Sequence, residues 1–143
     1  MPMIPRMIRI SLLAAGICAS SLAIAPADAQ RRGAGGEQEL ARVLKGRIPG
    51  RPINCINLST ITSTRIIAGT AIIYDAGRTI YVNRPRSGAD WLRRDDVLLT
   101  RTTGNRLCSI DTVRLVDRAA RIPRGFVALD RFVPYTRPRG DRR

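Results

Sequence analysis

From residue 53 onward, the chain alternates short apolar runs with polar turns. Isoleucine, valine, threonine and tyrosine dominate these runs, and this composition is typical of β-strands. Ile80 and Val82 alternate with Thr79 and Tyr81, as expected of a strand that buries one face. Glycine-bearing turns separate the runs and favour hairpins. We therefore expect strands near 53–58, 64–68, 70–75, 79–83, 97–102, 106–110, 111–117 and 126–133.

The apolar positions before this segment have a helical period instead. Leu40, Val43 and Leu44 lie at positions i, i+3 and i+4 and form one stripe. Acidic residues begin the segment 37–45 and basic residues end it, which suits the helix dipole. Gly46 then supplies a stop signal. The pattern predicts one short helix ahead of the strands.

Together these elements predict a mainly β protein with a single small antiparallel domain over residues 53–134. A partly open barrel and a sandwich both agree with the pattern. Residues 30–52 are expected to hold a flexible glycine-rich leader at 30–36, then the short helix and a linker. Prolines and arginines at 135–143 predict a basic disordered tail.

The beginning of the chain has the features of an export signal. Arg6 and Arg9 precede an uncharged, mostly apolar run over residues 10–25. Residues 27–29, Ala-Asp-Ala, then match the small-x-small cleavage rule. We predict a signal peptide over 1–29, cleaved after Ala29, and therefore a periplasmic or secreted protein.

Two other interpretations of this segment are less favoured. A membrane anchor needs roughly 20 apolar residues, and this run is shorter. Lipidation of Cys18 would need a small residue before the cysteine, but Ile17 is there. We therefore expect no membrane span once the signal is cleaved.

Two cysteines, Cys55 and Cys108, remain after this cleavage. An even number of cysteines in an exported chain predicts a disulfide. It would close a loop of about 50 residues and contribute roughly 4 kcal/mol of stability. The alternatives are two free thiols or a metal site. Because the chain contains no histidine, a zinc site would also need two carboxylates.

The charge balance points to an anionic partner. The chain holds 25 Lys and Arg against 11 Asp and Glu, a formal net charge of +14. Such a balance favours nucleic acid, lipopolysaccharide or another acidic polymer as a partner. Lys45 is the only lysine, and an arginine bias in the coding genome would give the same charge without binding. A solvated basic surface is therefore the alternative.

The loop over residues 83–88 is the best candidate for anion binding. Arg84 and Arg86 lie in this turn-rich segment, and Arg93 and Arg94 follow shortly after it. Guanidinium groups bind phosphate or carboxylate through paired hydrogen bonds. An ordinary solvated loop is the competing interpretation.

Catalysis is poorly supported. The absence of histidine removes the usual Ser-His and Cys-His nucleophilic systems and most catalytic zinc sites. Asp90, Asp95 and Asp96 form the acidic cluster, but adjacent residues of an extended strand point to opposite faces. We therefore expect neither an enzyme nor a bound cofactor.

Several short motifs of the β segment carry a resemblance to known proteins. They are Cys55-Ile56-Asn57-Leu58, Ser63-Thr64-Arg65-Ile66-Ile67, Thr70-Ala71-Ile72-Ile73-Tyr74, Tyr81-Val82-Asn83-Arg84, and Leu107-Cys108 with Asp111. Together they resemble a family of small secreted proteobacterial proteins of unknown function. The resemblance covers roughly residues 53–133 and implies export and a compact β domain, but no activity. Members of that family often have additional cysteines between the two that correspond to Cys55 and Cys108, whereas this chain has Ser87 and Gly88 in that loop.

These observations leave two functional hypotheses. The first is a non-catalytic periplasmic domain that contacts another protein of the cell envelope or an envelope surface. The second is a binder of anionic ligands, such as lipopolysaccharide phosphates or nucleic acid, through its surface arginines.

Overall fold

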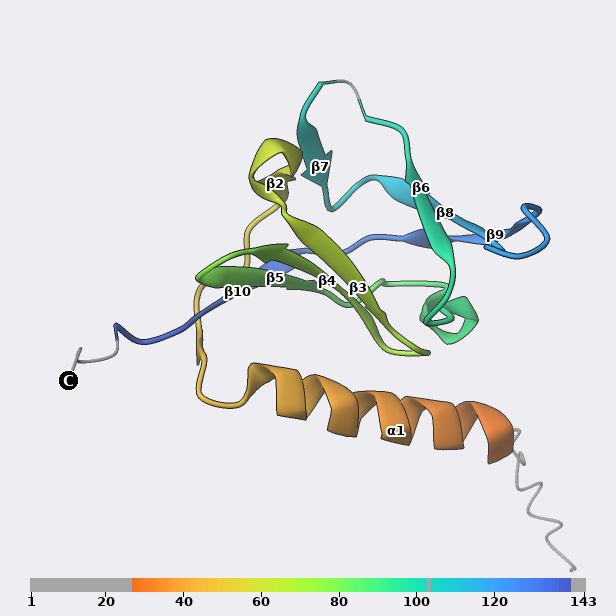
Figure 1. The fold of residues 1–143 in the computed structure, drawn as a ribbon, viewed down its shortest axis with the longest axis horizontal. Coiled ribbons are helices and arrows are strands. Elements are labelled where there is room, and N and C mark those ends of the chain that lie inside the picture. Colours follow the sequence, from red (N-terminus) through yellow and green to blue (C-terminus); the bar gives the residue numbers. More distant parts are fainter. Residues whose placement is uncertain (1–26, 103, 140–143) are drawn as a thin grey trace, which may run out of the picture.

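A computed structural model describes residues 27–102 and 104–139 (Figure 1). Most of the expected signal peptide therefore lies outside the described residues. The helices and strands, in chain order, are α1 (Ala27–Leu44), β1 (Ile48–Pro49), β2 (Cys55–Asn57), η1 (Leu58–Thr60), β3 (Ser63–Ile67), β4 (Ala71–Ala76), β5 (Thr79–Asn83), η2 (Ala89–Trp91), β6 (Val97–Thr100), β7 (Arg106–Cys108), β8 (Thr112–Val116), β9 (Pro123–Ala128) and β10 (Phe132–Thr136). The expected mainly β fold is confirmed, with a single α-helix at the start of the described residues.

In the described part of the chain, the strands form three antiparallel sheets, and none of them is closed. The largest has the order β1-β10-β5-β4-β3, the second has the order β6-β8-β9, and β2 pairs with β7. The helix α1 lies along one face of the five-stranded sheet, and the two smaller sheets lie beyond its other face (Figure 1). The chain is thus layered as a helix, a large sheet and two small sheets.

Alternation along the central strands supplies two cores. Ala71 and Ile73 of β4 pack toward α1, where Leu40 is almost completely buried. Ile72 and Tyr74 point the other way, into the core between the sheets. A strand covered on both faces needs apolar residues at successive positions, which explains why the β4 sequence is continuously apolar from Ala71 to Tyr74.

The helix begins earlier than the sequence suggested. Residues 30–36 were expected to be a flexible leader, but α1 runs through them from Ala27. Gly36 explains the difference, because it is buried where the helix meets the turn between β3 and β4. A Cβ atom at this position would lie 2.6 Å from the Ala68 carbonyl oxygen and 1.9 Å from Thr70 Oγ1. Tertiary packing therefore outweighs the low helix propensity of the glycines.

Gly36→Val is expected to lower the free energy of unfolding by about 1–3 kcal/mol, because the added side chain overpacks this contact. Urea denaturation measures the change. Gly35→Ala is the matched control, since a Cβ atom there meets nothing within 4 Å. The control should be neutral or stabilising by up to about 1 kcal/mol. Equal stability of Gly36→Val and the wild type would contradict the close helix–sheet contact.

The strand expected near 126–133 is two strands in different sheets. β9 ends at Ala128 and β10 begins at Phe132, so the chain changes sheet between them. The buried Asn83 side chain holds this corner, because its amide donates to the Asp130 carbonyl and its oxygen accepts the Asp130 N–H. β9 ends and β10 begins with apolar residues, and only the short segment Leu129-Asp130-Arg131 separates them.

The C-terminal boundary also differs from the expectation. The tail was expected to begin at residue 135, but β10 continues to Thr136 and the Arg137 N–H donates to the Arg78 carbonyl. β1 extends the same sheet beyond the expected domain, because Ile48 and Pro49 pair with β10. Residues 140–143 lie outside the described part of the chain.

Cys55 and Cys108 form the expected disulfide. They lie directly opposite each other in the β2–β7 pair, with a Cα–Cα distance of 4.0 Å. Asp111 supports the same corner, because its carboxylate accepts the Cys108 N–H at 2.7 Å. The bond joins residues 53 positions apart and ties the smallest sheet together.

Candidate functional site

The four arginines proposed from the sequence do not converge on one site. Arg84 forms a two-pronged ion pair with Glu37, and Arg94 pairs with Glu39. Both glutamates belong to α1, so these two arginines hold the helix against the sheet. The hydrogen bonds with Glu37 raise the pKa of Arg84, and the same contact lowers the pKa of Glu37.

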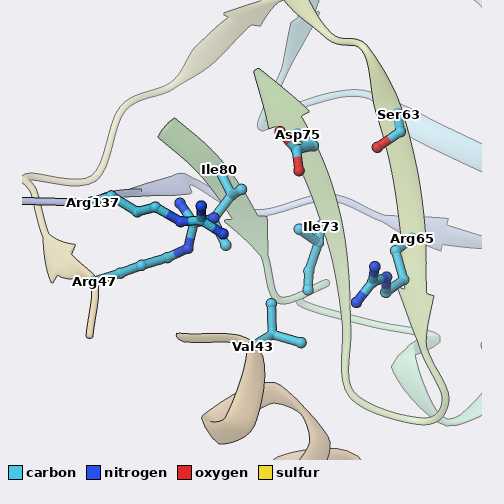
Figure 2. A pocket seen from close by; sticks show the side chains of 8 residues that line it. All are labelled: Val43, Arg47, Ser63, Arg65, Ile73, Asp75, Ile80 and Arg137. Carbon is cyan, nitrogen blue, oxygen red and sulfur yellow. The ribbon is translucent and has the colours of Figure 1, made fainter. Parts of the chain in front are cut away.

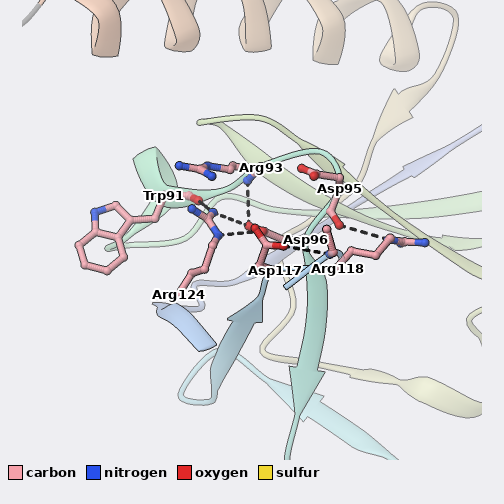
Figure 3. A network of polar contacts seen from close by, with 8 residues as sticks. Trp91, Arg93, Asp95, Asp96, Asp117, Arg118 and Arg124 are labelled. Carbon is pink, nitrogen blue, oxygen red and sulfur yellow. Dashed lines mark hydrogen bonds and ion pairs between the residues drawn. The ribbon is translucent and has the colours of Figure 1, made fainter. Parts of the chain in front are cut away.

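The other two proposed arginines lie elsewhere. Arg86 donates to the Ser109 carbonyl at 3.3 Å, which ties its loop to the end of β7. Arg93 lies beside Trp91 and Arg124 around a separate shallow hollow (Figure 3). The binding site predicted from these neighbours in sequence is therefore divided among different parts of the surface.

The acidic cluster contains a buried ion pair. Asp96 is only 2% exposed and accepts Arg124 Nε at 3.1 Å and Nη2 at 2.9 Å (Figure 3). The Arg93 N–H also donates to Asp96, and Arg124 donates to the Trp91 carbonyl. The hydrogen bonds with Asp96 raise the pKa of Arg124. Asp95 is exposed, so the two carboxylates do not share a site, although Asp95 lies in a turn and not in the extended strand assumed from the sequence. This network fastens the segment around η2 to β9.

Three other arginines surround a cavity of about 250 Å³ (Figure 2). We call it the arginine cleft. Its floor is apolar, and its rim carries one hydroxyl and one carboxylate. The lining residues are Val43, Arg47, Ser63, Arg65, Ile73, Asp75, Ile80 and Arg137.

The strand register explains why these residues meet. In β3 and β4, the positions that face α1 are odd-numbered, and Arg65 lies opposite Ile73 in the β3–β4 ladder. α1 ends at Leu44 and leaves the far end of this sheet face uncovered. The cleft lies at that end, between the last turn of the helix and the strands, where polar side chains replace the apolar ones.

Backbone contacts fix the cationic side of the cleft. Arg47 Nη1 donates to the Arg78 carbonyl at 3.1 Å and to the Tyr135 carbonyl at 3.5 Å. Arg78 in turn donates from Nη2 to the Arg137 carbonyl at 3.2 Å. These bonds place the Arg47 side chain beside Arg137 rather than free in solvent (Figure 2).

The cleft carries an excess of positive charge. Burial lowers the pKa of Arg47, and the neighbouring charge of Arg137 lowers it further, while Asp75 acts in the opposite direction. Among residues 27–102 and 104–139, no salt bridge involves Arg47, Arg65 or Arg137. Three guanidinium groups against the single carboxylate of Asp75 leave a net positive field that attracts an anion.

Sequence reasoning missed this cleft because its arginines are far apart in the chain. Arg47 lies in the linker, Arg65 in a strand, and Arg137 in the segment that the sequence predicts to be a disordered tail. One signal was available in β3. Ser63 and Arg65 occupy the same face as the buried Ile67, which marks the point where that face stops being covered.

The fold and the cleft define a small, mainly antiparallel β protein with a basic cleft on the helix side of its largest sheet. No family model matches the chain, and no curated protein or solved structure matches it either. Within the described residues, no helix is long and apolar enough to cross a membrane. The same part of the chain holds no group of three or more histidine, cysteine or acidic side chains that could bind a metal ion.

Proposed function

We propose that this protein is an exported, non-catalytic binding domain whose arginine cleft holds an anionic group of its ligand. The observation that carries the proposal is the pairing of Arg47 with Arg137 beside a cavity, with no ion-pair partner for either among the described residues. The disulfide supports the exported location, because such bonds persist in oxidising compartments.

The lining of the cleft narrows the class of ligand. Guanidinium groups bind phosphate, sulfate or carboxylate with paired hydrogen bonds. Val43, Ile73 and Ile80 add an apolar floor, which favours a ligand with apolar atoms next to its anionic group. Lipopolysaccharide phosphates fit this description. Nucleic acid is less well supported, because none of the described residues that line the cleft is aromatic and could stack on a base.

The double variant Arg47→Gln/Arg137→Gln is expected to bind lipopolysaccharide at least about tenfold more weakly than the wild type. Hydrogen bonds to charged groups contribute about 1.5–3 kcal/mol each, and about 1.4 kcal/mol corresponds to a tenfold change in affinity. Isothermal titration calorimetry at about 0.15 M salt provides the measurement, since distant charges are screened under that condition.

Arg84→Gln/Arg94→Gln is the matched control, because it removes the same charge from the surface. Those arginines form exposed ion pairs with α1, and such pairs contribute about 0–1 kcal/mol, so the control should stay folded. The control should bind lipopolysaccharide within about twofold of the wild type. Equal losses in both double variants would show that general surface charge, and not the cleft, binds the ligand.

A further inference from the structure

Two open strand edges border the same groove. β3 ends the five-stranded sheet, and β6 ends the three-stranded sheet. A groove of about 490 Å³ lies between them, and its volume falls within the roughly 300–1,000 Å³ typical of ligand sites. Its lining residues are Ser63, Thr64, Arg65, Ile66, Arg94, Asp96, Val97, Leu98 and Arg118.

The hairpin between β4 and β5 fixes which backbone groups of β4 point toward β3. A two-residue turn, Gly77–Arg78, joins these strands, so Ala76 and Thr79 form a hydrogen-bonded pair. In an antiparallel ladder, every second residue bonds to the same neighbour. The N–H and C=O groups of Ile73 and Asp75 therefore point away from β5 and toward β3.

The same alternation leaves part of β3 unpaired. Arg65 lies opposite Ile73, and Ser63 lies opposite Asp75, so these two residues bond to β4. Thr64 and Ile66 then direct their N–H and C=O groups into the groove. Within the described chain, no backbone hydrogen bond from outside the sheet satisfies these groups. β3 thus presents a free row of donors and acceptors.

The β6 edge has the same property. The Leu129 N–H donates to the Asp111 carbonyl, which sets the alternation in the β8–β9 pair. It follows that Arg114 of β8 bonds to Leu99 of β6. Leu98 is then the residue whose N–H and C=O groups point out of the sheet, toward the groove.

The opposite edges of these two sheets are protected against pairing. β1 is two residues long and contains Pro49. β9 contains Pro123 and an irregular register near its start, and Ser87 bridges to Ala128 at its other end. Short strands, prolines and covering segments are devices that prevent strand addition. β3 and β6 contain no proline.

We propose that the groove between β3 and β6 receives an extended acidic segment of a partner protein, which adds as a strand to these two edges. The backbone groups of Thr64, Ile66 and Leu98 provide the pairing, as in other cases of strand addition.

The groove lining explains why an acidic segment fits. Arg65 and Arg118 line it and form no ion pair within the described residues, whereas Arg94 is paired with Glu39. Asp96, the carboxylate in the lining, is already committed to Arg124.

The pleat of an added strand specifies its sequence pattern. Successive side chains of a strand point to opposite faces. One face of the added strand would continue the core side, next to the buried Ile66 and the half-buried Leu98. The other face would lie on the side of Arg65. We therefore expect alternating apolar and acidic residues in the segment that binds.

The test uses an eight-residue, fluorescently labelled peptide that alternates valine and glutamate, with binding measured by fluorescence anisotropy. Thr64→Pro removes an N–H that points into the groove and is not used in the β3–β4 ladder, so the fold should persist. This variant is expected to bind the peptide at least about tenfold more weakly. Thr64→Val, which keeps the N–H group, should bind like the wild type.

Two further measurements do not depend on the folding of the proline variant. Methylating the backbone amides of the peptide keeps its side chains and charge but removes its donors, and it should abolish binding. Arg118→Gln should weaken binding severalfold, while a peptide with lysine in place of glutamate should not bind.

Several outcomes would overturn the proposal. Undiminished binding by Thr64→Pro or by the methylated peptide would rule out strand addition. A wild-type dimer in analytical ultracentrifugation that Thr64→Pro dissociates would assign the edge to a second copy of this chain. Loss of peptide binding in Arg47→Gln/Arg137→Gln alone would place the peptide in the arginine cleft. If that double variant binds the peptide normally, the strand-addition site stands whether or not the cleft binds lipopolysaccharide.

Discussion

Replacing Cys55 and Cys108 together by alanine is expected to lower the free energy of unfolding by about 4 kcal/mol. The disulfide closes a loop between residues 53 positions apart, and the chain-entropy model assigns about this value to such a loop. Small domains have a total stability of about 5–15 kcal/mol, so the loss is a large fraction of the whole. Urea denaturation of the oxidised wild type and the double variant measures it.

The effect should be strongest around the β2–β7 sheet. Each of these strands has three residues, and an isolated two-stranded sheet is only marginally stable in water. Amide exchange in β2 and β7 should therefore accelerate more than exchange in β4 and β5. Detection of two reactive thiols in the denatured, unreduced protein would contradict the disulfide, and the mass of the intact chain provides an independent check.

Asp96→Ala is expected to destabilise the protein by about 3–5 kcal/mol, because it leaves the charge of Arg124 largely buried without its partner. Two further contacts would be disturbed. The Arg93 N–H loses its acceptor, and the Arg124 contact to the Trp91 carbonyl loses its support. The measurement is again the unfolding free energy from urea denaturation.

Asp95→Ala is the natural control for this prediction. Its carboxylate is exposed, and surface substitutions usually change stability by less than about 0.5 kcal/mol. A second control replaces Asp96 and Arg124 together by apolar residues of similar size. This double variant should cost less than Asp96→Ala, because no unpaired charge remains buried. A similar small loss for Asp96→Ala and Asp95→Ala would show that the ion pair does not fasten η2 to β9.

Local patterns were enough to predict most of the β fold. Alternation and turn residues placed the hairpin between β4 and β5 to within one residue, because both signals are local. Setting aside Cys18 in the expected signal peptide left Cys55 and Cys108 as a pair, and this pair predicted the disulfide. The break between β9 and β10 was missed because the buried amide of Asn83, which holds the corner, comes from a strand more than 40 residues earlier.

The candidate site was harder to predict for the same reason. Arg84 and Arg94 were attractive as neighbours in sequence, but glutamates on the far side of a helix–sheet contact neutralise them. That pairing depends on the docking of α1, which in turn depends on the absence of a side chain at Gly36. The cleft itself depends on which end of the sheet the helix leaves uncovered, and no local pattern contains that information.

The backbone bond between Arg137 and Arg78 has a further consequence for the end of the chain. It anchors the chain at the arginine cleft, so the arginines that follow in the sequence are covalently tethered to the site. A tethered group acts at a high effective concentration, and a polyvalent anion can engage the cleft and the tail together. Under the proposed function, we therefore expect the cleft and the arginines that follow it in the sequence to bind such an anion together, with an avidity above the affinity of either part.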